Sequence, residues 1–337
     1  MANVKSGREK LVRAIVIVSA VILLGVIAKT ITVPDEGSVS DNSVSHEGTS
    51  ESTTEKVENS IPTNTEEYGE LILTMIDVGQ ADSFLFEYDG KYALIDCGTR
   101  STGEDVVAYL NEKDITYLDY VFGTHPHDDH MGGMYDVITN VEVGKVVIPK
   151  VDAGEITANW YIKLVSELST GNYIVEYPEV GDTYYLEDVV MKVIAQLDDA
   201  KGNTNNYSTV MKVTLGEMDI IMTGDAETEV EKEILKSGED ISAEILKLGH
   251  HGSDTSTCDE FLEEVNPKYA LVSCHIGNKY EHPSKSTMEK LEKRNIDVYR
   301  TDESGTIVAT ITATDVEFSC EPGDYVSGPE LDERERQ

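Results

Sequence analysis

The loop at positions 125–130, His-Pro-His-Asp-Asp-His, constrains this chain more than any other part of its sequence. It follows an apolar run that ends at Phe122, and it supplies the imidazole nitrogens and carboxylate oxygens that Zn²⁺ and similar divalent ions bind. Gly132 and Gly133 then permit a sharp turn into a following helix. A fortuitous histidine-rich surface loop is the alternative. We expect a metal site in a loop that leaves the end of a β-strand.

Two further clusters also lie at the ends of apolar runs. Asp225 closes a Thr-Gly-Asp triplet after residues 218–222, and a carboxylate at a strand end can bridge two metal ions. His250 and His251 end the apolar run over 243–249; a lone histidine there would more often be structural, but an adjacent pair rarely is. Combined with the first loop, these clusters predict a site for two divalent ions, assembled from distant segments.

From Leu71 onward the sequence changes to short apolar runs that are separated by turn residues. Strands are predicted over 71–79, 83–88, 91–98, 120–125, 145–149, 189–197, 208–216, 218–224, 243–249 and 269–274. Helices are predicted over 103–113, 159–168, 227–236, 260–265 and 284–294. Strands that alternate with helices indicate a layered α/β domain.

The N-terminal segment predicts a membrane anchor. Residues 14–28 carry no charge, and the apolar stretch extends to Val33 if Lys29 reaches the interface, which is enough to cross a hydrocarbon layer of about 30 Å. Four cations precede it and favour a cytoplasmic N-terminus, with the rest of the chain outside the cell membrane: Lys5, Arg8, Lys10 and Arg13. A cleaved signal peptide, which would release a secreted protein, is the alternative.

The composition divides the chain into parts. Residues 1–33 are expected to form the basic stub and transmembrane helix, and residues 34–67 a disordered linker, because they contain almost no large apolar side chain. Residues 68–320 are expected to form the folded domain, and 321–337 a flexible acidic tail. The cysteines show no metal-binding spacing, so we expect buried thiols, with a disulfide left open.

The charge of the chain limits its partners. The formal net charge is −37, which repels polyanions at long range and disfavours broad electrostatic capture of nucleic acid. Phosphate chemistry stays open, because two bound divalent cations would reverse the field around the site.

Several segments share their order and spacing with a known family: residues 77–82, 94–98, 125–130, 215–225, 250–253 and 278–283. They resemble the metallo-β-lactamase superfamily and, within it, the extracellular hydrolase domain of the competence DNA-uptake channel ComEC. The resemblance spans residues 70–318 and implies a four-layer αββα sandwich with metal ions at one edge of its two sheets. It does not extend to the multi-span channel portion, so it carries no inference about transport.

The resemblance also implies a role for each candidate ligand of two divalent ions, Zn²⁺ or Mn²⁺. One ion is held by His125 and His127, the other by Asp129, His130 and either His250 or His251, and Asp225 bridges the two. Asp96 is implied to orient the metal loop through hydrogen bonds without touching an ion.

The chain departs from the family pattern in its set of histidines. Many superfamily members carry another histidine before the bridging carboxylate, whereas none lies between His130 and His250 here. Asn205, Asn206 or water would take that place, which weakens Zn²⁺ binding and leaves Mn²⁺ open. His127 also replaces an Asp that is common in the channel family.

These features predict a metal-dependent hydrolase, a phosphodiesterase or nuclease, in which a hydroxide held between two ions attacks an ester centre. Asp129 and His282 are the predicted catalytic residues; His282 would bind or protonate the leaving side of a phosphate, unless it only caps the turn before Pro283. The predicted substrate contacts are Asn206, Ser253, Asn278 and Tyr280.

The expected partners are a phosphodiester-containing substrate, either nucleic acid or an envelope polymer, and the membrane through the N-terminal helix; no protein partner is predicted. Two other functions stay open. One is a lactonase or β-lactamase, and the other is a non-enzymatic, metal-containing envelope binding module.

Overall fold

The computed structural model describes residues 68–336 with the exception of 153, 198 and 201. The predicted membrane anchor (1–33) and linker (34–67) lie outside the described residues. Within the described part of the chain, no helix has the length and apolar character needed to span a membrane.

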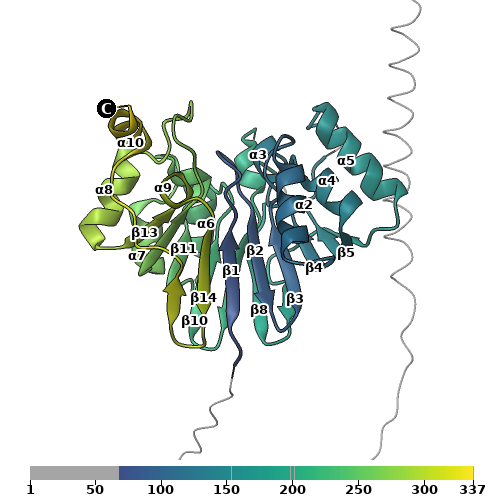
Figure 1. The fold of residues 1–337 in the computed structure, drawn as a ribbon, viewed down its shortest axis with the longest axis horizontal. Coiled ribbons are helices and arrows are strands. Elements are labelled where there is room, and N and C mark those ends of the chain that lie inside the picture. Colours follow the sequence, from purple (N-terminus) through teal and green to yellow (C-terminus); the bar gives the residue numbers. More distant parts are fainter. Residues whose placement is uncertain (1–67, 153, 198, 201, 337) are drawn as a thin grey trace, which may run out of the picture. The chain divides into compact units, whose positions relative to one another are not determined.

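The described residues form two mixed sheets (Figure 1). The eight-stranded sheet has the order β15-β14-β1-β2-β3-β4-β5-β6, and the seven-stranded sheet has the order β13-β12-β11-β10-β9-β8-β7. The first sheet contains β1 Leu71–Met75, β2 Phe84–Tyr88, β3 Lys91–Ile95, β4 Tyr117–Phe122, β5 Glu142–Val147, β6 Val175–Glu176, β14 Ile307–Ile311 and β15 Val316–Phe318. The second contains β7 Thr183–Leu186, β8 Val189–Ala195, β9 Val210–Leu215, β10 Met218–Met222, β11 Ile245–Lys247, β12 Tyr269–Val272 and β13 Asp297–Arg300.

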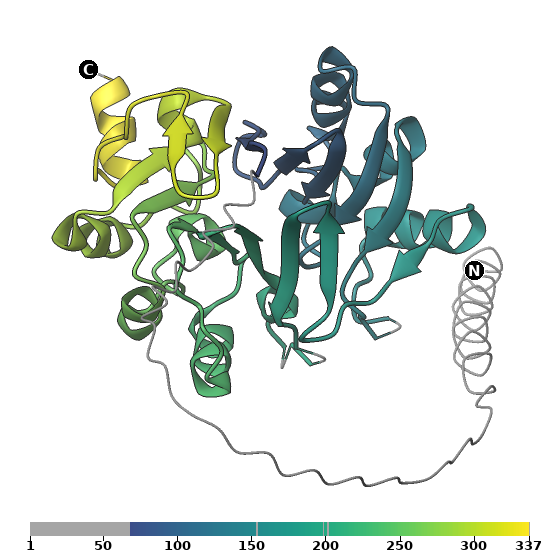
Figure 2. The ribbon, with the colours of Figure 1, turned by 90° about the horizontal axis from the view of Figure 1, so that it is seen from below.

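Helices cover the outer faces of both sheets (Figures 1 and 2). The first sheet is covered by α2 Gly103–Glu112, α4 Met134–Asn140 and α5 Asn159–Thr170, and the second by α6 Thr228–Ser237, α7 Asp259–Val265 and α8 Lys285–Arg294. Shorter turns occur at α3 Asp128–Met131, η1 Thr204–Tyr207, η2 Gly249–Gly252 and α9 Thr301–Ser304, and α10 is Gly328–Glu335.

Side-chain alternation along the strands explains the layers, because successive residues of a strand point to opposite faces. In β2, Phe84 and Phe86 lie in the central core between the sheets, whereas Leu85 packs in an outer core with Val106 and Leu110 of α2. Each sheet therefore buries one face against the other sheet and one against helices, which gives the α/β sandwich that the resemblance implies.

The second sheet follows the same rule. Ile220 of β10 lies in the central core, and its neighbour Ile221 packs outward with Val230 and Ile234 of α6. In both sheets the strands on one side are parallel: β3 to β6 in the first and β10 to β13 in the second. The carboxyl ends of parallel strands meet at one edge of a sheet, which is where polar loops can converge.

The C-terminal segment differs from the flexible tail predicted over 321–337. Residues Gly328–Glu335 form α10, whose N-cap Ser327 makes a capping box with Glu330. The fully buried guanidinium of Arg300 forms a bidentate ion pair with Asp302 and donates a hydrogen bond to the carbonyl oxygen of Val326. This segment is acidic in composition, but a single buried arginine and a helix cap order it against the domain.

Candidate metal centre

The three sequence clusters lie at the carboxyl ends of strands from both sheets. The 125–130 loop and α3 follow β4, Asp225 follows β10, and η2 with its two histidines follows β11. In Figure 1, α3 lies at the upper edge of the sheets. The distant segments that the sequence predicted to form one site are therefore adjacent in space.

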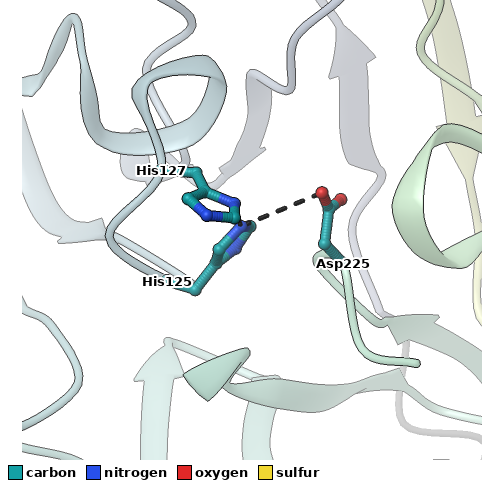
Figure 3. Close-up of side chains that lie close together, drawn as sticks. All are labelled: His125, His127 and Asp225. Carbon is teal, nitrogen blue, oxygen red and sulfur yellow. Dashed lines mark hydrogen bonds and ion pairs between the residues drawn. The ribbon is translucent and has the colours of Figure 1, made fainter. Parts of the chain in front are cut away.

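A first group of ligand atoms comes from His125, His127 and Asp225 (Figure 3). Nε2 of His125 lies 3.0 Å from Nδ1 of His127 and 3.8 Å from Oδ2 of Asp225. His125 and Asp225 are almost fully buried, and His127 is half-buried.

A second group comes from Asp129, His130 and His251. Oδ1 of Asp225 lies 3.1 Å from Nε2 of His130 and 3.7 Å from Nε2 of His251, and the latter atom is 3.7 Å from Oδ2 of Asp129. Asp225 thus faces the first group with one carboxylate oxygen and the second group with the other.

The donor set fits divalent metal ions. Nε2 of His130, Nε2 of His251 and Oδ1 of Asp225 are buried side-chain atoms without a hydrogen-bond partner, although they lie close together. Leaving buried polar atoms unsatisfied is costly, and a shared cation would satisfy all three at once. Imidazole nitrogen and carboxylate oxygen suit Zn²⁺ and Mn²⁺ alike.

Asp96 supports the metal loop from behind. Its Oδ2 lies 2.8 Å from Nδ1 of His130, and both the backbone N–H and the hydroxyl of Thr124 donate hydrogen bonds to its carboxylate. An acceptor at Nδ1 fixes the His130 ring so that Nε2 faces Asp225. This is the contact that the family resemblance implied for Asp96.

His250 and His251 differ in burial and in the direction that their rings face. His251 is buried and its Nδ1 donates a hydrogen bond to the carbonyl oxygen of Ser273 at 2.8 Å, which turns its Nε2 into the second group. The side chain of His250 is 24% exposed, and its Nδ1 lies 3.4 Å from a carboxylate oxygen of Glu227. His250 nevertheless stays near the centre, with Nε2 3.8 Å from Oδ2 of Asp225.

We therefore expect His251→Ala to lose one of the two metal ions, whereas His250→Ala retains both. The reason is that only His251 faces Asp129 and Asp225 with a buried, unpaired nitrogen. Metal content after gel filtration, measured by atomic spectroscopy, distinguishes the two variants. The reverse pattern, with His250→Ala as the depleted variant, would contradict this assignment.

The carboxylates of the centre draw positive charge onto the imidazoles. Burial opposes protonation of His130, but Asp225 and Asp96 outweigh it and raise the pKa of His130 well above its ordinary value. Burial is likewise outweighed at His251, where neighbouring carboxylates, Asp225 first, raise the pKa to about 10. At His125 burial prevails, with His130 second, and the pKa falls well below its ordinary value.

Metal binding should consequently release protons. Both His130 and His251 stay protonated at neutral pH in metal-stripped protein, and an ion can bind an imidazole nitrogen only after its proton leaves. We expect about two protons to be released on loading at neutral pH, and metal affinity to rise between about pH 6 and pH 9. Calorimetry in two buffers of different ionisation enthalpy counts the protons. Loading without proton release would contradict the raised pKa values.

One wall of the site is built of rings. His282 is 8% exposed, and its ring centroid lies 5.2 Å from that of His250 and 5.8 Å from that of Tyr280, which is 51% exposed. Nδ1 of His282 is buried without a hydrogen-bond partner. Burial, followed by His250 and His251, lowers the pKa of His282 to about 4, so that its imidazole is neutral at pH 7.

The other predicted substrate contacts are engaged in the fold. The Asn278 amide donates to the carbonyl oxygens of His275 and His282, and its oxygen accepts from the backbone N–H groups of Tyr280 and His282. Asn278 therefore braces its own loop, and its contact with substrate stays a prediction. Ser253 is buried and pairs with Thr255.

Of the two asparagines predicted to take the place of the missing histidine, Asn205 lies next to His250. Asn205 is hydrogen-bonded to Glu227, and its Nδ2 lies 3.4 Å from Nδ1 of His250. Asn206 donates to Glu229. The amide oxygens of both asparagines are buried without a hydrogen-bond partner.

Two residues of the centre, Asp82 and Lys247, were not predicted from the sequence to belong to the site. Asp82 belongs to the segment 77–82 that supports the resemblance, and Lys247 ends the otherwise apolar strand β11. Their side chains form a fully buried ion pair at 2.6 Å beside Asp225. A lysine between Leu246 and Leu248 was the one signal in the sequence that could have indicated it.

Comparison with known proteins agrees with this geometry. The family model described as the metallo-beta-lactamase superfamily matches residues 76–275. ComE operon protein 3 of Bacillus subtilis is 32% identical over 251 residues, which are 69% of this chain and 32% of that protein. Competence protein ComA of Neisseria gonorrhoeae is 30% identical over 241 residues, 71% of this chain and 32% of that protein. The chain thus spans about a third of the length of these curated relatives.

A solved structure shares the fold. The diiron beta-hydroxylase CmlA from Streptomyces venezuelae superposes with a TM-score of 0.50 at 13% identity, over 73% of this chain and 55% of that one. At this identity the likeness concerns the fold alone.

Proposed function

The chain belongs to the metallo-β-lactamase superfamily, and on that premise we propose that it is a two-metal phosphodiesterase that cleaves short or single-stranded nucleic acid. One observation carries the proposal: Asp225 faces two separate groups of ligand atoms with its two carboxylate oxygens. A bridging carboxylate serves a reaction in which two ions act together, and a binding module has no need of one.

The residues that would hold the ions follow from the two groups. His125 and His127 would hold one ion, Asp129, His130 and His251 the other, and Asp225 both. Two divalent ions supply Lewis acidity and an activated water at neutral pH. Asp96 and Thr124 keep the His130 ring in place while charge develops on the substrate.

His282 is proposed to bind the substrate. Because its pKa is about 4, it carries no proton to give to a leaving group at neutral pH. A neutral imidazole still offers one N–H donor, and the His282 ring lies beside His250, with 5.2 Å between the ring centroids. We therefore assign His282 to a hydrogen bond with the phosphate, and not to general acid catalysis.

The choice of nucleic acid rests on the relatives and on charge. One of the relatives is named Competence protein ComA, and another is named Recombination protein 2, of Haemophilus influenzae. A net charge of −37 disfavours contacts along an extended polyanion, which supports a short substrate that meets few side chains.

The test is a substrate panel on the purified full-length chain loaded with Mn²⁺ or Zn²⁺. It contains bis(p-nitrophenyl) phosphate, short single-stranded DNA and RNA, duplex DNA and the β-lactam nitrocefin. We expect metal-dependent cleavage of the diesters that EDTA abolishes, and a shallow dependence of the cleavage rate on salt. Turnover of nitrocefin alone would favour a lactamase, and no turnover of any diester would refute the proposal.

We further propose that residues 1–33 anchor the chain in the cell membrane with the catalytic domain outside, as their sequence predicts. Protease added to intact cells should then remove the domain.

A further inference from the structure

The ligand cage is the set of metal-ligand side chains around Asp225, together with Asp82 and Asp96. Lys247, at the end of β11, places its ammonium group inside this cage. The residue is fully buried, and its Nζ lies 2.6 Å from Oδ2 of Asp82 and 3.8 Å from Oδ1 of Asp225. It also donates a hydrogen bond to the carbonyl oxygen of Gly224 at 2.8 Å. A buried ammonium is tolerated only when it is paired and hydrogen-bonded, and these contacts meet both conditions.

Asp82 lies where a metal ligand would lie, but its carboxylate is already paired with another side chain. Its carboxylate, Asp225 and His251 offer a group of ligand atoms within 4.8 Å of one another, and its Oδ1 lies 3.3 Å from Nδ1 of His251. However, the ammonium of Lys247 lies against its other oxygen, and the same His251 nitrogen donates to Ser273. The ammonium group of Lys247 thus occupies the place at the Asp82 carboxylate that a metal ion would otherwise take.

The charges of the cage show what this ammonium does. Four carboxylates converge there, namely Asp82, Asp96, Asp129 and Asp225, and in the described part of the chain Lys247 is the one lysine or arginine paired with any of them. One ammonium leaves an excess of negative charge that two divalent ions and a single anion would balance. Without it, the cage would attract a further cation.

We propose that Lys247 is the resident third cation of the centre: it holds Asp82 away from the metal ions and limits the cage to two divalent ions. This inference rests on the proposed two-metal centre. Lys247 is a positioning residue, because its buried side chain reaches Asp82, Gly224 and Asp225 but has no path to substrate.

The experiment compares Mn²⁺ stoichiometry and affinity in Lys247→Met, Asp82→Asn and the double variant. Lys247→Met uncovers a carboxylate, so we expect a third ion and at least about tenfold tighter binding. Asp82→Asn frees the ammonium to repel the ions, so we expect at least about tenfold weaker binding. The double variant should return to two ions. Without metal, Lys247→Met should lower the melting temperature by roughly 10 °C, and Mn²⁺ should restore most of that loss.

Lys145→Met is the matched control, because it removes a half-buried lysine of β5 whose ion pair is with Glu176 and not with a carboxylate of the cage, and it should change neither measurement. Unchanged or weaker Mn²⁺ binding in Lys247→Met would overturn the proposal. If that variant does not fold, Asp82→Asn decides: unaltered affinity refutes the role of Lys247, and loss of a whole ion makes Asp82 a metal ligand instead. Wild type that holds no metal would refute the two-metal centre, and in that case only the gain of metal by Lys247→Met would support the resident cation.

Discussion

Asp225→Asn should abolish hydrolysis while the protein stays folded. We expect the rate on a diester substrate to fall by at least about 10³-fold and one of the two metal ions to be lost. The change keeps the shape of the side chain but removes its charge, and an amide offers one oxygen where the carboxylate offers two. Surrounding imidazoles, chiefly His130 and His251, hold the pKa of Asp225 well below its ordinary value although burial opposes them, so the native side chain is ionised.

The matched control is Asp128→Asn, in the metal loop itself. Asp128 pairs with Arg100 at 2.8 Å, its side chain is 37% exposed, and it belongs to neither group of ligand atoms. We expect it to keep metal content and activity within about twofold. Steady-state kinetics and metal analysis on both variants give the answer. An active Asp225→Asn variant that holds two ions would exclude a bridging role. If the wild type shows no turnover and the variant still binds the same partner as the wild type, a binding module would be favoured.

Gly133→Ala should destabilise the domain strongly and release the metal ions with it. A Cβ atom at this position would lie 2.1 Å from the carbonyl oxygen of Cys97 and 2.7 Å from Cα of Gly103, and both are backbone atoms that cannot rotate away. The start of α2 or the metal loop must shift. Because the backbone N–H of Cys97 is bonded to the carbonyl oxygen of His130, the ligand moves too.

We expect a loss of about 3 kcal/mol in the free energy of unfolding and a clear loss of Mn²⁺ affinity. Urea denaturation with and without Mn²⁺ measures both. Gly69→Ala is the control, because the nearest atoms to its added Cβ would belong to the Tyr88 side chain, at an ordinary 3.5 Å. Equal stability of the two variants would show that the contact between the metal loop and α2 is not tight.

The sequence predicted five of the described helices, α2, α5, α6, α7 and α8, because each shows an apolar stripe and a clear end, but no residue range was predicted for α3, α4, α9 or α10. The helix predicted over 284–294 is α8, Lys285–Arg294, with Ser284 as its N-cap. The strands were predicted too long at their carboxyl ends; residues 71–79 contain β1, which ends at Met75. The reason is that the residues after a strand in this fold stay apolar while they turn into the site, as Ile76 and Val78 do in the outer core.

The ligand clusters could be identified from the sequence, since histidines and carboxylates at strand ends are a local signal. The choice between His250 and His251 could not, because both have positive φ angles of 51° and 53° and only the fold decides which ring turns inward. The pairing of Asp82 with Lys247 also depends on contacts between distant parts of the chain. A lysine between two leucines signals a buried cation, but no local pattern reveals which carboxylate pairs with it.

The pairing of β1 with β14 sets the order in which the domain can be assembled. Residues Leu71–Met75 lie between β2 and β14, Ile307–Ile311. One of the first segments of the domain to be synthesised therefore cannot complete its pairing until one of the last has been synthesised. Contacts so far apart in sequence slow folding. A nascent chain halted before Ile307 would therefore leave the edge of β1 without its β14 partner and open to pairing with other chains.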